Sequence, residues 1–297
     1  MKTIHLLFGY LKLGVLLLGS LAGLIVAGVH FWSWQWQWQH LAIFIGTFVA
    51  IMFGVTLYYH RRLAHEAYDF TWVGNYTLRP LLQFCAAISC QGPFAWWGAN
   101  HREHHEGADK PDKDPHTPHR PWRHFLSKAS NFLWAHMRWI PHARPDIEAF
   151  VKARRLNAVD HVLSYGAIYL LIGPFTYALC MYLVGGWLGI AWYFAAVWAT
   201  LHLTWGVNSA GHLWGSRRFK TNEHSRNIHV LSPLSGGEYQ HHNHHAFPWS
   251  ARFGHRKWEI LLDPGYLALC FFKLFPVPLV CNIRVPTPQQ IQRRLAK

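Results

Sequence analysis

Histidines of this chain recur at short, regular intervals. The 297 residues include 23 histidines, and three short segments concentrate them: HRRLAH with His60 and His65, HREHH with His101, His104 and His105, and QHHNHH with His241, His244 and His245. Imidazole is the commonest metal ligand among side chains. Residues i, i+3 and i+4 share one face of an α-helix. We therefore expect each triplet to turn its rings toward metal from one helix.

Two further elements extend this pattern. His60 and His65 are five residues apart and do not share a face on an ideal α-helix, so they either bind different metals or lie where a helix ends. The segment NSAGH places Asn208 and His212 at positions i and i+4, just beyond the last apolar run. A metal cluster gathered from several helices is typical of helical di-metal proteins.

Spacing alone does not identify the metal, because imidazole suits zinc, copper, iron and nickel. Glu103, Glu106 and Glu238 are the nearby carboxylates, and each could orient a ligand or simply face solvent. Glu238 precedes His241 by three residues, so either role suits it equally. His242 breaks the spacing of its cluster. We interpret it, and the thirteen histidines outside the clusters, as ordinary surface or core residues.

The elements that must position these residues are apolar helices. Residues 13–31, 41–59, 162–184 and 188–205 are rich in apolar side chains, and each run is close to the roughly 20 residues that cross a bilayer. Gly185 and Gly186 mark a tight turn within the second pair. Four such runs argue against the alternative of buried helices in a soluble protein. We predict an all-α integral membrane fold, a single domain over residues 1–297, with four transmembrane helices in two hairpins. Residues 81–97 and 266–280 are interpreted as helices lying on the membrane.

The distribution of basic residues predicts the orientation. Residues 60–161 carry 14 Lys and Arg and residues 206–297 carry 12, whereas the two short turns carry none. By the positive-inside rule, both long segments and the N-terminus are cytoplasmic. All histidine elements then lie in one cytoplasmic helical cap. The formal net charge of +14 is explained in this way, and no nucleic-acid-binding motif accompanies it.

The histidine motifs and the NSAGH segment resemble those of a known family. HRRLAH, HREHH with the later DPH, NSAGH and GEYQHHNHHAFP are similar to the histidine boxes of membrane acyl-CoA desaturases of the stearoyl Δ9 type, with bacterial members most similar. The resemblance implies two iron ions held by nine histidines, with Asn208 linked through water: His60, His65, His101, His104, His105, His212, His241, His244 and His245. His242 and Asn243 occupy the middle of the last box differently from the family pattern. The segment EGADKPDKD also differs, so we expect different contacts with the acyl headgroup.

The resemblance implies a cis double bond, at Δ9, placed in a long-chain acyl group with O2 and two electrons. Thr204 and Trp205 are candidates for lining the substrate tunnel, although ordinary helix packing explains them equally well. The acyl group could be carried by CoA, by acyl carrier protein or by a lipid. The chain has no iron–sulfur cysteine pattern and no dinucleotide-binding fingerprint. A separate donor, namely a ferredoxin, rubredoxin or cytochrome b5, is therefore expected. A bacterial inner membrane is the expected location.

Two alternatives remain open at the level of the sequence. Related membrane di-iron proteins hydroxylate lipids or alkanes, and the spacing of the ligands does not separate hydroxylation from desaturation. A metal transporter or non-catalytic metal sensor is the second alternative. Transporters usually place ionisable residues within the membrane along a path, whereas here the histidine elements follow the apolar runs.

Overall fold

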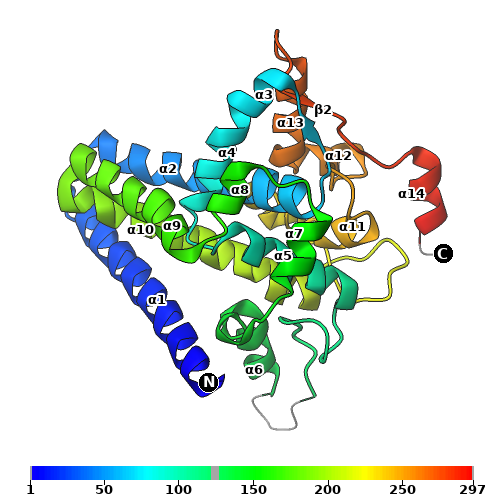
Figure 1. Ribbon diagram of the computed structural model, residues 1–297, viewed down its shortest axis with the longest axis horizontal. Coiled ribbons are helices and arrows are strands. Elements are labelled where there is room, and N and C mark those ends of the chain that lie inside the picture. Colours follow the sequence, from blue (N-terminus) through cyan, green and yellow to red (C-terminus); the bar gives the residue numbers. More distant parts are fainter. Residues whose placement is uncertain (1, 122–126, 296–297) are drawn as a thin grey trace.

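The computed structural model describes residues 2–121 and 127–295 and is mostly helical (Figure 1). The first half contains α1 (Lys2–Trp32), α2 (Trp38–Phe53), the π-helix η1 (Gly54–Ala64), β1 (Asp69–Phe70), α3 (Trp72–Tyr76), α4 (Leu78–Ala87), α5 (Phe94–Gly107), α6 (Ser127–Leu133), η2 (Trp134–Arg138), η3 (Ile140–His142) and α7 (Ile147–Ala153). The second half contains α8 (Ala158–Val162), α9 (Gly166–Leu170), η4 (Leu171–Phe175), α10 (Thr176–Leu213), η5 (His229–Leu231), η6 (Pro233–Ser235), α11 (His241–Ala246), α12 (Lys257–Leu261), α13 (Pro264–Leu274), β2 (Val280–Cys281) and α14 (Pro288–Arg294).

Three helical stretches are long and apolar enough to cross a membrane: Gly9–Trp32, Trp38–Ala64 and Gly166–Leu213. Large apolar side chains such as Val15, Leu18 and Leu183 are exposed along them. A continuous exposed apolar surface of this kind needs a cover other than water. Hydrocarbon is the natural cover, because these helices satisfy their own backbone hydrogen bonds.

The third stretch reverses direction at the predicted glycine turn. Gly186 has φ 59° and ψ −151°, outside helical values, and glycine alone adopts this region without strain. The two arms then run side by side. The rings of Tyr177 and Tyr193 are 5.0 Å apart, and a Cβ on Gly189 would collide with the carbonyl oxygen of Met181. The turn contains no polar residue, so hydropathy runs through it without interruption.

The two turns of the apolar helices lie at one end of the molecule. His30, near the end of α1, accepts a hydrogen bond from the indole of Trp192, with the two nitrogens 3.2 Å apart. The His40 ring, at the start of α2, lies beside Gly185. At its other end, α1 contacts η3, where the hydroxyl of Tyr10 lies 2.7 Å from the ring nitrogen of His142. The histidine-rich segments therefore gather at the end opposite the turns.

The elements differ from the sequence predictions in their bounds. The second apolar helix continues through η1 to Ala64, and α10 continues to Leu213, because apolar composition marks only the part of a helix that faces lipid.

Residues 81–97 form two helices, not one: Cys90 and Gly92 have positive φ, and Pro93 lacks the N–H that would continue α4 into α5. The fold is also not purely α-helical, because β1 and β2 form a short antiparallel pair.

The main core holds the cap against the ends of the long helices. It includes Tyr58 and Tyr59 of η1, Phe94 of α5, Phe150 of α7 and Tyr193 of α10, all nearly inaccessible to solvent. Every residue of η1 is buried. The last eleven residues of the second apolar helix are thus surrounded by protein, and this part carries the first histidine motif.

Candidate metal centre

All nine histidines predicted as ligands lie in two adjoining groups. The first group contains five, and their ring nitrogens all lie within 4.8 Å of one another: His60, His65, His101, His105 and His244. The second group contains four at the same spacing: His104, His212, His241 and His245. Each group has the dimensions of a single metal site, and α5 and α11 contribute to both.

The π-helix explains how His60 and His65 reach the same group. In η1 the backbone N–H of His65 donates to the carbonyl of His60, 3.2 Å away, which is the i→i+5 pattern of a π-helix. This wider turn aligns residues five apart, and the two rings are 5.0 Å apart. The two histidines therefore do not lie in separate groups, which was one of the two predicted alternatives. His65 follows Ala64, the last residue of η1, as the other alternative anticipated.

Each histidine triplet is divided between the two groups. His101 and His105 of α5 face the first group, whereas His104 faces the second. In α11, His244 belongs to the first group, and His241 and His245 belong to the second. The i, i+4 pairs stay together and the remaining histidine turns to the neighbouring group. One short helix can in this way bridge two adjacent metal ions.

The spacing of the ring nitrogens fits metal ligands. In the first group, the Nε2 atoms of His60 and His244 are 3.0 Å apart, those of His65 and His101 are 2.8 Å apart, and those of His105 and His244 are 2.9 Å apart. In the second group, His212 and His241 are 2.9 Å apart, and His245 lies 3.1 Å from both His104 and His241. Two nitrogens that each lie about 2.1 Å from one metal ion, at right angles, are about 3.0 Å apart.

Carboxylates hold the outer nitrogens of three of these rings. The Nδ1 atom of His104 lies 3.0 Å from Asp114, and that of His212 lies 3.0 Å from Asp109. The Nδ1 atom of His60 contacts Glu238. A carboxylate behind a metal-ligating histidine fixes its tautomer and leaves Nε2 free to bind metal. Glu238 therefore takes the orienting role, one of the two that the sequence allowed.

The same contacts set the ionisation of the site. Burial, and then neighbouring imidazoles, lower the pKa values of His101, His105 and His244 well below the usual value for histidine. Burial would raise the pKa of Asp109, but the hydrogen bond and charge attraction of His212, together with the hydrogen bond from the backbone N–H of His224, outweigh burial and bring that pKa to about 2. Burial would also raise the pKa of Asp114, but His104, His116 and His212 together outweigh burial and lower that pKa. Neutral rings of His101, His105 and His244, with ionised Asp109 and Asp114 nearby, are in the form that binds cations.

Glu238 belongs to a buried charged network behind the first group. Burial would raise its pKa, but His60 and Arg61 lower it. The fully buried guanidinium of Arg61 lies 3.3 Å from Glu238 and 2.7 Å from Asp263. Thr56 donates a further hydrogen bond to Glu238. This network connects η1, the segment before α11 and the start of α13, so the position of His60 depends on three elements.

The sequence did not reveal the roles of Asp109 and Asp114. Both lie in the segment interpreted as a headgroup contact, yet both are buried against the second histidine group. Asp114 also accepts hydrogen bonds from the backbone N–H groups of Asp109 and His116, at 2.8 and 3.0 Å. The one signal was the DPH sequence beginning at Asp114. Glu103 and Glu106, in contrast, pair with the backbone of Asp146 and with Arg102, away from the rings.

The two departures in the last histidine box have structural roles. His242 accepts a hydrogen bond from the backbone N–H of Phe219, 2.9 Å away, and so faces away from both groups. Asn243 donates to Glu259 and also exchanges hydrogen bonds with Asn227. Together they fasten α11 to the loop that follows α10. The metal-facing positions of the helix are left unchanged.

The remaining predicted residues lie on α10. Asn208 is half-buried, one turn before His212. The hydroxyl of Thr204 accepts a hydrogen bond from Gln91, 3.1 Å away, and Gln91 accepts one from the indole of Trp97. The Trp97 ring stacks on His101 with centroids 5.1 Å apart. Thr204 is thus connected to the first histidine group through two side chains, whereas Trp205 is buried in the core.

Comparisons with known proteins agree with this site. The family described as fatty acid desaturase matches residues 34–261, a region that contains all nine histidines. Delta-9 acyl-lipid desaturase 2 of Arabidopsis thaliana is 32% identical in an alignment 258 residues long, which covers 82% of this chain and 74% of that protein. The sn-1 stearoyl-lipid 9-desaturase of Anabaena variabilis is 33% identical over 213 residues, 70% of this chain and 71% of the relative.

A third relative, the sn-2 palmitoyl-lipid 9-desaturase of Nostoc sp. (strain 36), is 31% identical over 215 residues, 70% of this chain and 69% of that protein. The names of these three relatives refer to acyl groups in lipids, not to acyl-CoA. The expected resemblance therefore holds for the family, while the relatives differ from the expected acyl-CoA type. Two histidine groups at the end of long apolar helices, within a matched region of this length, place this chain in the fatty acid desaturase family.

Proposed function

We propose that this fatty acid desaturase forms a cis double bond at the Δ9 position of a long-chain acyl group, using O2 and two electrons at a pair of iron ions. The observation that carries the proposal is the pair of adjoining imidazole groups at the end of the apolar helices. The five-histidine group would hold one iron and the four-histidine group the other. Asn208 would contact the second iron through water.

When two iron ions are bound, they supply the oxygen chemistry needed to remove hydrogen from an unactivated methylene. The residues of the chain then have positioning roles. The nine imidazoles would present ring nitrogens to the two ions, and Glu238, Asp109 and Asp114 hold three of the rings in place through their Nδ1 atoms. The acyl chain must lie still beside the irons, because selectivity among equivalent methylenes depends on position alone.

The substrate channel is proposed to pass the Thr204 side of α10. The hydrogen bonds from Trp97 to Gln91 and from Gln91 to Thr204 tie the segment between α4 and α5 to α10, next to His101. Side chains fixed in this way would define where the acyl chain bends, and Trp205 would contribute an apolar wall. The three relatives are named for lipid-bound acyl groups. We therefore propose an acyl-lipid substrate, with acyl-CoA as the alternative.

The membrane arrangement is proposed to be four spans in two hairpins, with both termini cytoplasmic, in a bacterial inner membrane. The reversal at Gly186 supports counting the third apolar stretch as two spans. The contact of Tyr10 with His142 supports a cytoplasmic N-terminus, because it joins the start of α1 to the basic segment 60–161. Electrons are proposed to come from a separate ferredoxin, rubredoxin or cytochrome b5.

Expression in a desaturase-deficient host, followed by fatty-acid analysis with double-bond localisation, tests the proposal. We expect a new Δ9 cis-monoene with the unaltered chain. No product is expected with His104→Ala or His244→Ala, because each change removes one ligand from one group. His161→Ala is the control, since His161 is exposed on α8. All variants should remain in the membrane.

Metal analysis of the purified protein provides the second test. Two irons per chain are expected, with fewer in the His104→Ala and His244→Ala variants. A single zinc per chain would contradict the di-iron proposal. A hydroxylated acyl product would identify a hydroxylase instead. Metal transport into vesicles without any lipid product would favour the transporter alternative.

A further inference from the structure

A cavity of about 390 Å³ leads from the surface to the two histidine groups. His105 and His245 form part of its lining, so it reaches one member of each group. Ala108 and Pro248 are the apolar members of the lining, and the rest are polar or charged. This composition does not suit an acyl chain, which needs an apolar channel. The cavity does bring the aqueous surface within one side chain of both proposed irons.

Basic residues from two segments surround this cavity. Lys220 and Arg294 belong to its lining. The two segments adjoin, because the backbone N–H of Lys220 donates to the carbonyl of Arg294, 2.8 Å away. Phe219 also pairs with Leu295. We define the basic rim as five residues: Arg217, Arg218, Lys220, Arg293 and Arg294.

Two kinds of carboxylate position occur at this rim: the buried Glu259 lies 3.9 Å from Arg218, and Glu223 lies at the cavity. Glu223 is part of the cavity lining, and its carboxylate lies 3.9 Å from the Nδ1 atom of His245. Arg217 donates to the backbone carbonyls of Thr221 and Glu223, at 3.3 and 2.6 Å, which holds the basic rim against the cavity mouth. The rim therefore presents a positive surface around an opening to the metal ligands. Such a surface attracts a negatively charged partner over about a Debye length.

We propose that the basic rim docks an acidic one-electron carrier protein, which reduces the metal pair across His105 and His245. The inference rests on the proposed function, because a desaturase needs two external electrons. Each docking event oxidises one reduced carrier by one electron and reduces the metal pair by one. Two carriers are therefore used per double bond. Complementary charge on the two proteins sets the association rate and the orientation of the complex.

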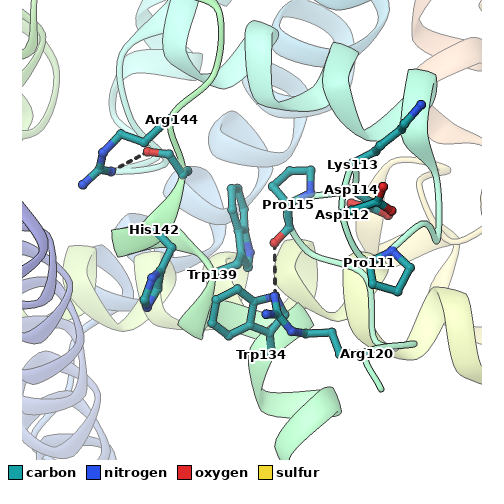
Figure 2. A pocket seen from close by; sticks show the side chains of 11 residues that line it. Pro111, Asp112, Lys113, Asp114, Pro115, Arg120, Trp134, Trp139, His142 and Arg144 are labelled. Atoms are coloured by element: carbon teal, nitrogen blue, oxygen red, sulfur yellow. Dashed lines mark hydrogen bonds between the residues drawn. The ribbon is translucent and has the colours of Figure 1, made fainter. Parts of the chain in front are cut away.

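A second basic pocket offers a comparison surface on the same molecule. Figure 2 shows it between Trp134 and Trp139 on one side and Asp112, Lys113 and Asp114 on the other. Arg144 also lines it, but none of the nine predicted ligands does. A path from this pocket to the irons passes through at least one further side chain before it reaches a predicted ligand: Asp114, which lines the pocket, lies 3.0 Å from the Nδ1 atom of His104. Trp139 lies 4.9 Å from His116, and His116 lies 4.3 Å from His104, measured between centroids. The shorter path starts at the basic rim.

Charge reversal on the two surfaces tests the assignment. The double variant Lys220→Glu with Arg293→Glu changes two exposed side chains of the basic rim. The matched control, Lys113→Glu with Arg144→Glu, changes two exposed side chains of the second pocket by the same charge. The probe is an acidic plant-type [2Fe–2S] ferredoxin. Its dissociation constant is measured against the full-length protein in nanodiscs of uncharged lipid, at low and high salt.

The basic-rim variant is expected to raise the dissociation constant about tenfold at low salt. The control should stay within about twofold of the unaltered chain, and the difference should shrink at high salt. Equal losses at both surfaces, a larger loss in the control, or unchanged binding in both would overturn the proposal. Iron content checks that each variant is folded. If charge reversal lowers it, Lys220→Gln with Arg293→Gln replaces the first variant.

Failure of this inference is distinguishable from failure of the proposed function. Ferredoxin binding is measured without turnover, whereas the function is tested by the lipid product of the unaltered chain. A Δ9 product together with insensitive ferredoxin binding would overturn the docking surface alone.

Discussion

Carboxylates that bond the Nδ1 atoms of three imidazoles hold these rings in position. Asp114 bonds the outer nitrogen of His104 and also two backbone N–H groups, so it fixes both the ring and the loop that follows α5. Ten residues separate Asp114 from His104, and 103 separate Asp109 from His212. Neither separation in sequence corresponds to residues that share a helix face. The two histidine triplets could therefore be found from their spacing, but the carboxylates that bond the outer nitrogens of the rings could not.

Asp114→Ala is expected to lower iron affinity about 10- to 100-fold, as is usual when the hydrogen-bond partner of a metal-ligating histidine is removed. Asp114→Asn should lose less, because its amide oxygen still accepts a hydrogen bond. Iron binding is measured by competition with a chromophoric chelator.

Asp112→Ala is the control for this prediction. Asp112 is exposed in the same loop, two residues before Asp114. Its replacement should leave iron affinity unchanged. Equal iron affinity in the Asp112 and Asp114 variants would show that the carboxylate behind His104 does not support the site.

At the scale of elements, the π-helix η1 could not be inferred from the sequence. The apolar run predicted a second span over residues 41–59, and its continuation to Ala64 carries no pattern that separates an α-helix from a π-helix. The wider turn matters because it brings His60 and His65 to one group. The triplets on α5 and α11 were easier to predict, since their i, i+3 and i+4 spacing belongs to an ordinary helix.

The junction between α2 and η1 depends on a close approach of α4. A Cβ on Gly54 would overlap the backbone of Cys85 and Ala86, whereas a Cβ on Gly46, in the same long helix, would meet nothing within 4 Å. Gly54→Ala should therefore destabilise the protein by about 1–3 kcal/mol, the usual range for overpacking. Gly46→Ala should be close to neutral.

Thermal unfolding in detergent, followed by intrinsic fluorescence, measures both variants. A lower midpoint for Gly54→Ala together with an unchanged midpoint for Gly46→Ala is the expected result. Similar midpoints for the two variants would mean that α4 does not pack against this junction as closely as described. Iron content should fall in Gly54→Ala as well, because η1 carries His60.

At the scale of the whole molecule, the basic charge is distributed with the histidine groups. Residues 60–161 and 206–297, which contain the histidine groups, carry 14 and 12 of the 28 Lys and Arg residues, and the structure gathers these segments at one end and the two turns at the other. Hydropathy and charge therefore predicted that the histidine groups and the two turns lie at opposite ends of the apolar helices. The reversal at Gly185 and Gly186 was predicted from the two glycines and not from hydropathy, because a turn without polar residues interrupts no apolar run.

The proposed orientation predicts opposite accessibility at the two ends of the molecule. Gln35 is exposed in the turn between α1 and α2, and Gln289 is exposed on α14 near the histidine groups. In a chain whose five cysteines are replaced by alanine, a membrane-impermeant thiol reagent on intact cells should label Gln35→Cys and not Gln289→Cys. Permeabilised cells should allow both to be labelled, which serves as the control. Labelling of Gln289→Cys in intact cells would place the metal ligands outside the cytoplasm, where a cytoplasmic electron carrier could not reach the basic rim.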